Sequence, residues 1–86
     1  MNEFLHIGFD SYVNVFKVIL ISEMDAAKLR REMAKRELDK NSPKFWNAGG
    51  AKEIKSVILC DDGLMIASAI GADTLIKRFI EMKKGG

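Results

Sequence analysis

An Asp62-Gly63 dipeptide stands between two apolar runs, and it limits the possible folds more than any other part of the chain. Glycine tolerates a positive φ angle, so Asp-Gly between apolar runs is a strong signal for a tight antiparallel hairpin in a primed turn. We therefore expect a strand from about Lys52 to Cys60 and a returning strand from Leu64 to Ile70. A chain built around such a hairpin contains a sheet.

The N-terminal part of the chain predicts two further strands. Glu3 to Phe9 alternates loosely between apolar and polar residues, and Gly8 inside it suggests a bulge or a close backbone approach. Tyr12 to Ile21 is rich in β-branched and aromatic residues, which are typical of strands. We expect this second strand to bend near Asn14 or Lys17.

Two segments predict helices. The first begins around Ser22, a plausible N-cap, and runs to about Leu38, and the second runs from Gly71 to about Lys84. Lys44 to Ala51 reads as a loop. The expected architecture is a single small α+β domain over residues 1–86, in ββαββα order, with a mostly antiparallel sheet and two helices.

The residues needed for catalysis are scarce in this sequence. It holds one His and one Cys, and no metal-ligand spacing, phosphate-binding loop or nucleophile elbow is visible. His6, Cys60 and the Asp61-Asp62 pair read as a strand residue, a small buried hydrophobe and a turn. We expect no enzyme, no metal, no cofactor and no small-molecule substrate.

Positive charge is concentrated in the middle of the chain. Lys and Arg number 14 against 12 Asp and Glu, but residues 17–55 carry ten against six, an excess of +4. Such a segment is compatible with a solvated helix of mixed charge, or with a surface that binds phosphate by counterion release. Charge alone leaves both readings open.

Signals for a membrane or for secretion are weak. No apolar run approaches the roughly 18 residues of a membrane span. The first ten residues lack the basic start and apolar stretch of a signal peptide, and a single cysteine cannot form an internal disulfide. We expect a cytoplasmic protein with no membrane contact.

The small size of the chain favours self-association. A chain of 86 residues buries only about 60–65% of its unfolded surface. Even so, Val18–Ile21, Val57–Leu59 and Leu64–Ile70 are apolar on both alternating faces. One layer of helix does not cover both faces of such a sheet, so we expect the uncovered face to be a subunit interface.

Three motifs in register suggest a family. They are His6-Ile7-Gly8-Phe9 followed by Tyr12-Val13, then Ser56-Val57-Ile58-Leu59-x-Asp61, then Ala67-Ser68-Ala69-Ile70-x-x-Asp73-Thr74-Leu75-x-x-Arg78. In order, spacing and total length the chain resembles the small bacterial RemA-type regulators of extracellular-matrix genes. The resemblance covers nearly the whole chain.

The resemblance implies a function and an assembly. It implies a transcriptional regulator of biofilm matrix genes that binds double-stranded DNA, a fold related to LytTR DNA-binding domains, and a ring-shaped homo-oligomer. The DNA-binding arginines of the family match Lys17 and a segment that contains Lys52 and Lys55. Arg30 and Arg31 on the first predicted helix are additional candidates for DNA contact.

The chain departs from the family pattern at these positions. Lysine replaces arginine, which favours phosphate contact over bidentate base readout, and Glu53 reverses a charge. The alternative function is therefore an oligomeric scaffold or interaction protein that does not bind nucleic acid.

Overall fold

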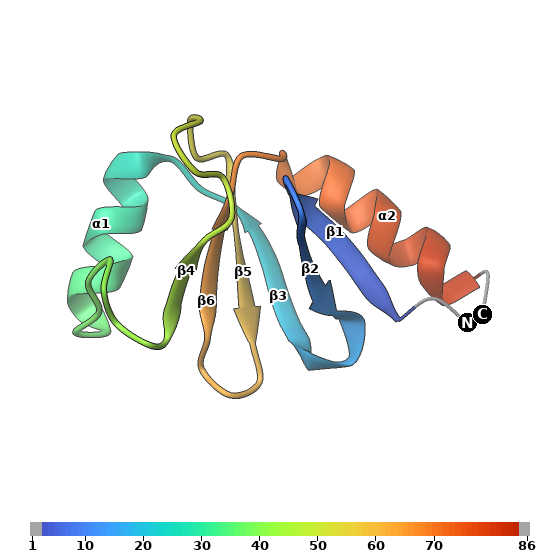
Figure 1. The fold of residues 1–86 in the computed structure, drawn as a ribbon, viewed down its shortest axis with the longest axis horizontal. Coiled ribbons are helices and arrows are strands. Elements are labelled where there is room, and N and C mark those ends of the chain that lie inside the picture. Colours follow the sequence, from blue (N-terminus) through green and yellow to red (C-terminus); the bar gives the residue numbers. More distant parts are fainter. Residues whose placement is uncertain (1–2, 85–86) are drawn as a thin grey trace.

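The computed structural model describes the backbone of residues 3–84 and the side chains of residues 3–82. The elements in chain order are β1 (Phe4–Gly8), β2 (Ser11–Asn14), the 3-10 helix η1 (Val15–Lys17), β3 (Val18–Glu23), α1 (Ala26–Lys35), β4 (Phe45–Asn47), β5 (Ser56–Cys60), β6 (Met65–Ser68) and α2 (Ala72–Lys84) (Figure 1). Two helices with antiparallel and mixed sheets confirm the α+β class. Residues 1, 2, 85 and 86 of the expected domain lie outside the described part.

The strands form two sheets. β1 and β2 make an antiparallel hairpin of their own, and the other strands form a sheet in the order β3-β5-β6-β4. The pairs β3–β5 and β5–β6 are antiparallel, whereas β4 runs parallel to β6. Figure 1 shows α1 beside β4 at one end of the molecule and α2 beside β1 at the other.

The expected ββαββα order is not confirmed, because the chain has more strands than that order allows. The segment Tyr12–Ile21 is not one strand: η1 interrupts it, and the Asn14 side chain accepts a hydrogen bond from the Phe16 amide at 2.9 Å to cap η1. The interruption falls where a bend was expected. Phe45–Asn47, inside the expected loop, pairs with β6. A relation to LytTR domains stays a prediction.

The β5–β6 hairpin is confirmed, but its turn differs from the expected one. The Gly63 amide donates to the Cys60 carbonyl at 3.0 Å, and the Cys60 amide donates to the Leu64 carbonyl at 2.9 Å. Of the three loop residues, Gly63 alone has a positive φ, of 86°. A three-residue loop with its left-handed residue last matches the twist of the strands as well as a primed two-residue turn does.

The four-stranded sheet separates two hydrophobic cores. The first lies between one face of the sheet, the β1–β2 hairpin and α2, and its buried members are Leu5, Ile7, Val13, Val15, Ala48, Ile58, Cys60, Ile66 and Leu75. The second lies on the other face beneath α1 and buries Leu29, Val57, Met65 and Ala67. Successive residues of β5 and β6 therefore enter opposite cores, as the pleat requires.

Two buried serines connect the sheet to its neighbours. Ser56 and Ser68 are paired across β5 and β6, and both are fully buried. The Ser68 hydroxyl donates to the Ile7 carbonyl of β1 at 2.6 Å, and the Ser56 hydroxyl donates to the Ile70 carbonyl at 2.6 Å. Buried hydroxyls are tolerated because each has a partner.

Helix α1 begins later than the sequence suggests. Asp25, and not Ser22, is the N-cap, and its carboxylate accepts a hydrogen bond from the Lys28 amide at 2.8 Å. This hydrogen bond lowers the pKa of Asp25. Among the described residues, no helix is long and apolar enough to cross a membrane.

Candidate functional site

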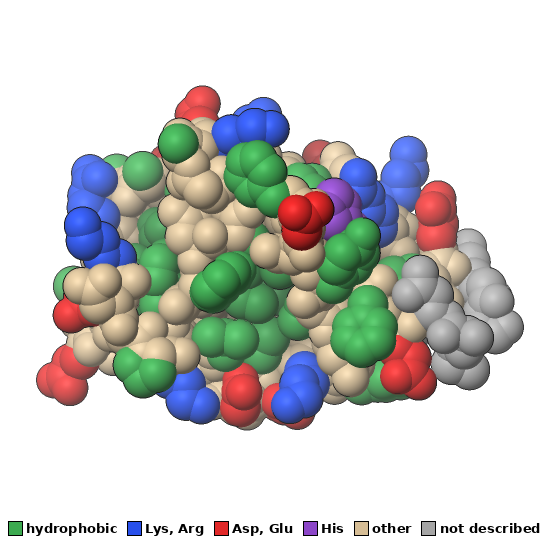
Figure 2. Space-filling model, in the orientation of Figure 1, with side chains coloured by type: hydrophobic (Ala, Val, Ile, Leu, Met, Phe, Trp, Pro, Cys, Tyr) green, Lys and Arg blue, Asp and Glu red, His purple; other side chains and the backbone are tan. Residues whose placement is uncertain are grey.

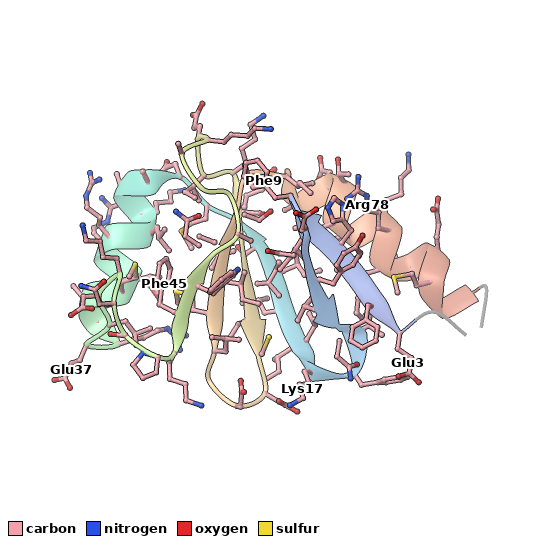
Figure 3. All side chains as sticks on the ribbon, viewed as in Figure 1. Glu3, Phe9, Lys17, Glu37, Phe45 and Arg78 are labelled. Carbon is pink, nitrogen blue, oxygen red and sulfur yellow. The ribbon has the colours of Figure 1, made fainter. Side chains whose placement is uncertain are left out.

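The structure places Lys17 and Lys55 at opposite ends of the sheet. Lys17 directly precedes β3 and Lys55 directly precedes β5, and these two strands are antiparallel neighbours. β3 has six residues, which at about 3.3 Å per residue separates the two lysines by roughly 20 Å. Figure 3 shows Lys17 at the edge that carries the β5–β6 turn. Within one subunit, the two lysines therefore cannot bind the same phosphate.

The turn that carries Asp61 and Asp62 lies beside Lys17. The Lys17 carbonyl accepts a hydrogen bond from the Asp61 amide at 2.8 Å. The Leu64 amide lowers the pKa of Asp62, and the positive charges of Lys44 and Lys17 add to this effect. Because Asp61 and Asp62 stand next to it, Lys17 offers little net positive charge.

Lys55 lies in a more acidic setting. It lines a recess of about 510 Å³ between the start of α1 and the start of α2. The charged residues that line this recess are Lys28, Lys55, Glu23, Asp25, Glu53 and Asp73. Carboxylates outnumber ammonium groups there, so the recess is poorly suited to a phosphate.

Lys52 lines a different recess from Lys55. Its ammonium nitrogen lies 5.1 Å from the centroid of the Phe9 ring, which is a cation–π contact at the tip of the β1–β2 hairpin. The small recess at this tip, of about 200 Å³, is lined by His6, Gly8, Phe9, Ala48, Gly49, Lys52, Ala69 and Ile70. None of these is a carboxylate, so Lys52 is the best placed of the three lysines to meet an anion.

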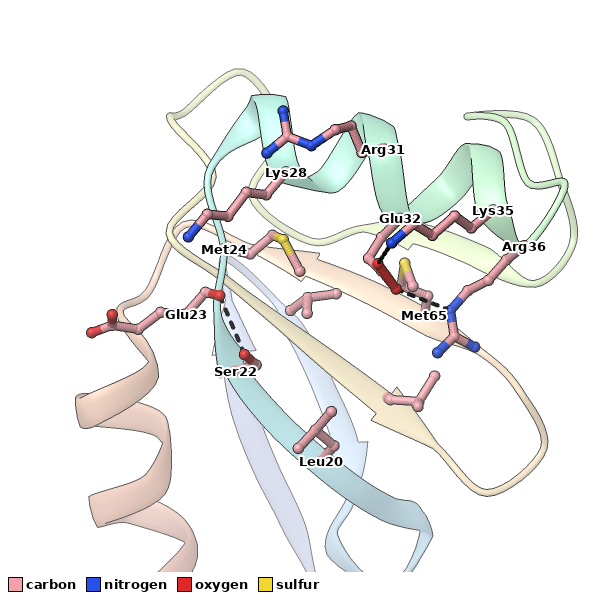
Figure 4. Close-up of a pocket in the computed structure, with 12 residues that line it drawn as sticks. Leu20, Ser22, Glu23, Met24, Lys28, Arg31, Glu32, Lys35, Arg36 and Met65 are labelled. Atoms are coloured by element: carbon pink, nitrogen blue, oxygen red, sulfur yellow. Dashed lines mark hydrogen bonds and ion pairs between the residues drawn. The ribbon is translucent and has the colours of Figure 1, made fainter.

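Helix α1 borders a groove of about 470 Å³ on the face of the sheet that it covers incompletely (Figure 4). The floor is apolar, and the basic rim consists of Lys28, Arg31, Lys35 and Arg36. Arg31 lines the groove. Arg30 is also exposed but, at about 100° per residue around the helix, it faces away from the groove.

The ion pairs of α1 leave most of its positive charge uncompensated. Glu32 pairs with Lys35 at 3.6 Å and with Arg36 at 4.0 Å. Arg31 makes no ion pair with any residue in the described part of the chain. Exposed pairs contribute little to stability, so the rim cations remain available to an external anion.

The side chains with metal-binding or nucleophilic chemistry are engaged within the fold. His6 donates from Nε2 to the Phe9 carbonyl, and its ring lies 5.1 Å from that of Tyr12. Cys60 is buried, which raises the pKa of its thiol, as do the charges of Asp62 and Asp61. Within residues 3–84, no group of three or more His, Cys, Asp or Glu residues is placed to hold a metal ion.

Large apolar side chains are exposed on several elements. They are Phe4, Phe9, Tyr12, Phe16, Ile19, Leu20, Trp46, Ile76 and Ile80. Figure 2 shows hydrophobic side chains gathered over the middle of one face. Within one chain the run Val18–Ile21 is only partly covered, because Ile19 and Leu20 are 64% and 50% exposed. That the uncovered surface is a subunit interface stays a prediction.

Sequence reasoning missed two parts of this arrangement. Phe9 was identified only as a motif residue, and its contact with Lys52 depends on a loop closure that no local pattern shows. The basic rim of the groove holds Arg31 with Lys28, Lys35 and Arg36, but not Arg30, and the groove that groups these cations was not expected. Their spacing at intervals of three and four residues is the signal that places most of them on one side of the helix.

Comparison with known proteins places the sequence of this chain in a regulatory family. The model of the RemA-like family, described as extracellular matrix regulatory protein A-like, matches residues 4–79. A predicted regulatory protein of Coprothermobacter proteolyticus is 36% identical over 78 residues, 91% of this chain and 71% of the relative. Another from Oleidesulfovibrio alaskensis is 31% identical over 77 residues, 90% of this chain and 88% of that protein.

Proposed function

Since the chain belongs to the RemA-like family, a family of regulatory proteins, we propose that it is a DNA-binding transcriptional regulator that acts as a ring-shaped homo-oligomer. Such a regulator of matrix genes works in the bacterial cytoplasm. The DNA lies along one surface of the ring, and Lys52 and Arg31 supply the main contacts to its phosphates. Lys17, Lys55 and Arg30, which are less favourably placed in one subunit, supply weaker contacts. Residues that lie far apart in one subunit reach the same DNA from neighbouring subunits.

The exposed cations of α1 and Lys52 carry this proposal. Lys28, Arg31, Lys35 and Arg36 share one side of α1, and a single carboxylate, that of Glu32, pairs with two of them. Each lysine or arginine on a phosphate releases condensed counterions, which favours binding. One subunit contributes few contacts, but a ring repeats them at fixed spacing and gains from effective concentration.

The exposed apolar run supports self-association. Tyr12, Phe16, Ile19 and Leu20 follow one another from β2 through η1 into β3, and each is at least half exposed. β3 also lies at the edge of its sheet. Exposed large apolar side chains in such number on a small domain favour an interaction site, and a closed ring of identical subunits would cover them in every copy.

A titration of double-stranded DNA against the full chain tests the proposal. At about 50 mM salt we expect binding, with affinity that falls steeply as salt is added. Lys52→Ala removes one phosphate contact per subunit, so it should weaken binding on every sequence and flatten the salt dependence. Lys77→Ala, an exposed lysine on α2 outside all of these surfaces, is the matched control.

Two outcomes contradict this proposal. No binding of any duplex at about 50 mM salt removes the DNA-binding function. If the duplex binds but Lys52→Ala and Lys77→Ala behave alike, Lys52 is not a phosphate contact.

The groove beside α1 favours a second function, that of an oligomeric scaffold for a protein partner. Its floor contains Leu20 and Leu59, and its rim is basic, so it suits an acidic amphipathic segment better than a bare phosphate. Glu53 and the carboxylates around Lys55 point the same way. The absence of DNA binding, together with an intact oligomer, would favour this function.

A further inference from the structure

Phe9, at the tip of the β1–β2 hairpin, has a backbone conformation that bulky residues rarely adopt. Its φ angle is 44°, in the left-handed region, and its side chain is 59% exposed (Figure 3). A bulky side chain in this region strains the backbone. Neither the backbone angle nor the exposure of the ring is favourable by itself.

The surrounding residues hold this conformation. His6 donates a hydrogen bond to the Phe9 carbonyl. Gly8 lies so close to the Ala48 carbonyl that a Cβ atom there would approach its oxygen to 2.8 Å. Gly50 packs against the ring itself, where a Cβ would lie 3.1 Å from Phe9 Cε2. The strained conformation therefore persists because these three neighbours hold the backbone and the ring in place. Strain that is held in this way is typical of functional sites, which makes the exposed Phe9 ring a candidate for one.

The charge around Phe9 suits a polyanion. Lys52 lies 5.1 Å from the ring centroid, and no carboxylate lines the recess that they share. Asp10 follows Phe9 in the sequence and Glu53 follows Lys52, but neither carboxylate lines this recess. A phosphate held by Lys52 would leave Phe9 within reach of the adjacent sugar and base step.

We propose that Phe9 is a wedge that inserts between base pairs of double-stranded DNA while Lys52 neutralises the neighbouring phosphate. This inference rests on the proposed DNA-binding function, and it adds a residue that discriminates between DNA sequences. Lysines on phosphates position the DNA without reading it. Apolar wedges unstack a base step, and the cost depends on how easily that step deforms, so sequence is selected through flexibility.

The test compares two duplexes of equal length and charge with the full-length protein. One carries flexible TA and CA steps once per helical turn with 2-aminopurine beside them, and the other is a stiff A-tract with the same reporter. Since the phosphates are equal in number, counterion release contributes about equally to the binding of both duplexes. We expect the wild-type protein to bind the flexible duplex about tenfold more tightly and to raise the 2-aminopurine fluorescence as the base unstacks.

Phe9→Asn removes the ring while keeping a residue that tolerates the left-handed region, and Phe9→Gly serves as a second variant that accepts this backbone freely. Both should bind the two duplexes within about twofold of each other, with an unchanged salt dependence and no fluorescence rise. Phe4→Asn, at the opposite end of β1 and also exposed, is the matched control and should keep the wild-type preference.

The outcomes separate the wedge from the function on which it rests. Wild-type binding to both duplexes with equal affinity overturns the wedge and leaves the regulator intact. A preference that survives in folded Phe9→Asn or Phe9→Gly overturns it as well. If the wild-type protein binds neither duplex at about 50 mM salt, the DNA-binding function itself fails.

Discussion

Ser68 is the residue at which the β1–β2 hairpin is hydrogen bonded to the main sheet. Ser68→Ala removes the donor to the Ile7 carbonyl and leaves that buried oxygen without its partner. An orphaned buried acceptor costs about 1–3 kcal/mol, so the free energy of unfolding should fall by that amount in urea titrations. Thr74→Ala, at an exposed position on α2, should change it by less than about 0.5 kcal/mol. Equal effects would show that the buried hydroxyl contributes nothing specific.

Cys60 allows a prediction about pH. Burial first, and then the charges of Asp62 and Asp61, raise the pKa of the thiol, so less thiolate is present at any given pH than in a free cysteine. Since the thiolate is the nucleophile, alkylation of the native protein at pH 8 should be at least about tenfold slower than in guanidinium. Mass spectrometry of the alkylated chain measures this difference. Equal rates in the two states would contradict the burial of Cys60.

At the scale of single elements, the β5–β6 turn depends on one glycine. Gly63 has a φ of 86°, and no atom lies within 4 Å of the position that its Cβ would take, so backbone strain alone opposes a larger residue. Gly63→Ala should lower the free energy of unfolding by about 1 kcal/mol. Gly63→Asn should cost less, because asparagine tolerates the left-handed region. Thermal unfolding of both variants distinguishes strain from crowding, since crowding would penalise asparagine more.

The elements that the sequence predicted well are those with a strong local pattern. The β5–β6 hairpin follows from Asp62-Gly63, although β5 begins four residues later than expected, at Ser56. Helix α2 follows from its apolar spacing and begins one residue later than expected. Gly8 was expected to mark a bulge or a close approach, and both occur, since the β1–β2 register shifts there.

The elements that were missed depend on contacts distant in sequence. β4 is a three-residue strand that exists because β6 offers it a parallel edge. η1 forms where the chain leaves the hairpin to join the main sheet, which no periodicity reveals. The separation of Lys17 from Lys55 has the same cause, since the direction of the strands, and not distance in sequence, decides which residues lie at the same end of the sheet.

At the scale of the whole molecule, the apolar run ending in β3 predicts where subunits meet. Leu20 is half exposed, so Leu20→Asp should leave the fold of the subunit intact and reduce the mass of the assembly in light scattering at micromolar concentration. Ile80→Asp on α2, with 47% exposure, is the matched control and should leave the mass unchanged. Dissociation by Ile80→Asp alone would place the joint at α2 instead.

The presence of a core on each side of the sheet has a consequence for folding fidelity. In a sheet with one solvated face, a slip of one residue is penalised because apolar side chains turn outward. Here a slip of β5 by one residue would only exchange Val57 and Ile58 between the two hydrophobic cores. The Ser56 hydroxyl supplies the missing penalty, because a slip of β5 by one residue would turn it to the other face of the sheet, away from the Ile70 carbonyl that accepts its hydrogen bond. This one buried hydroxyl thus favours the correct register of the central strands.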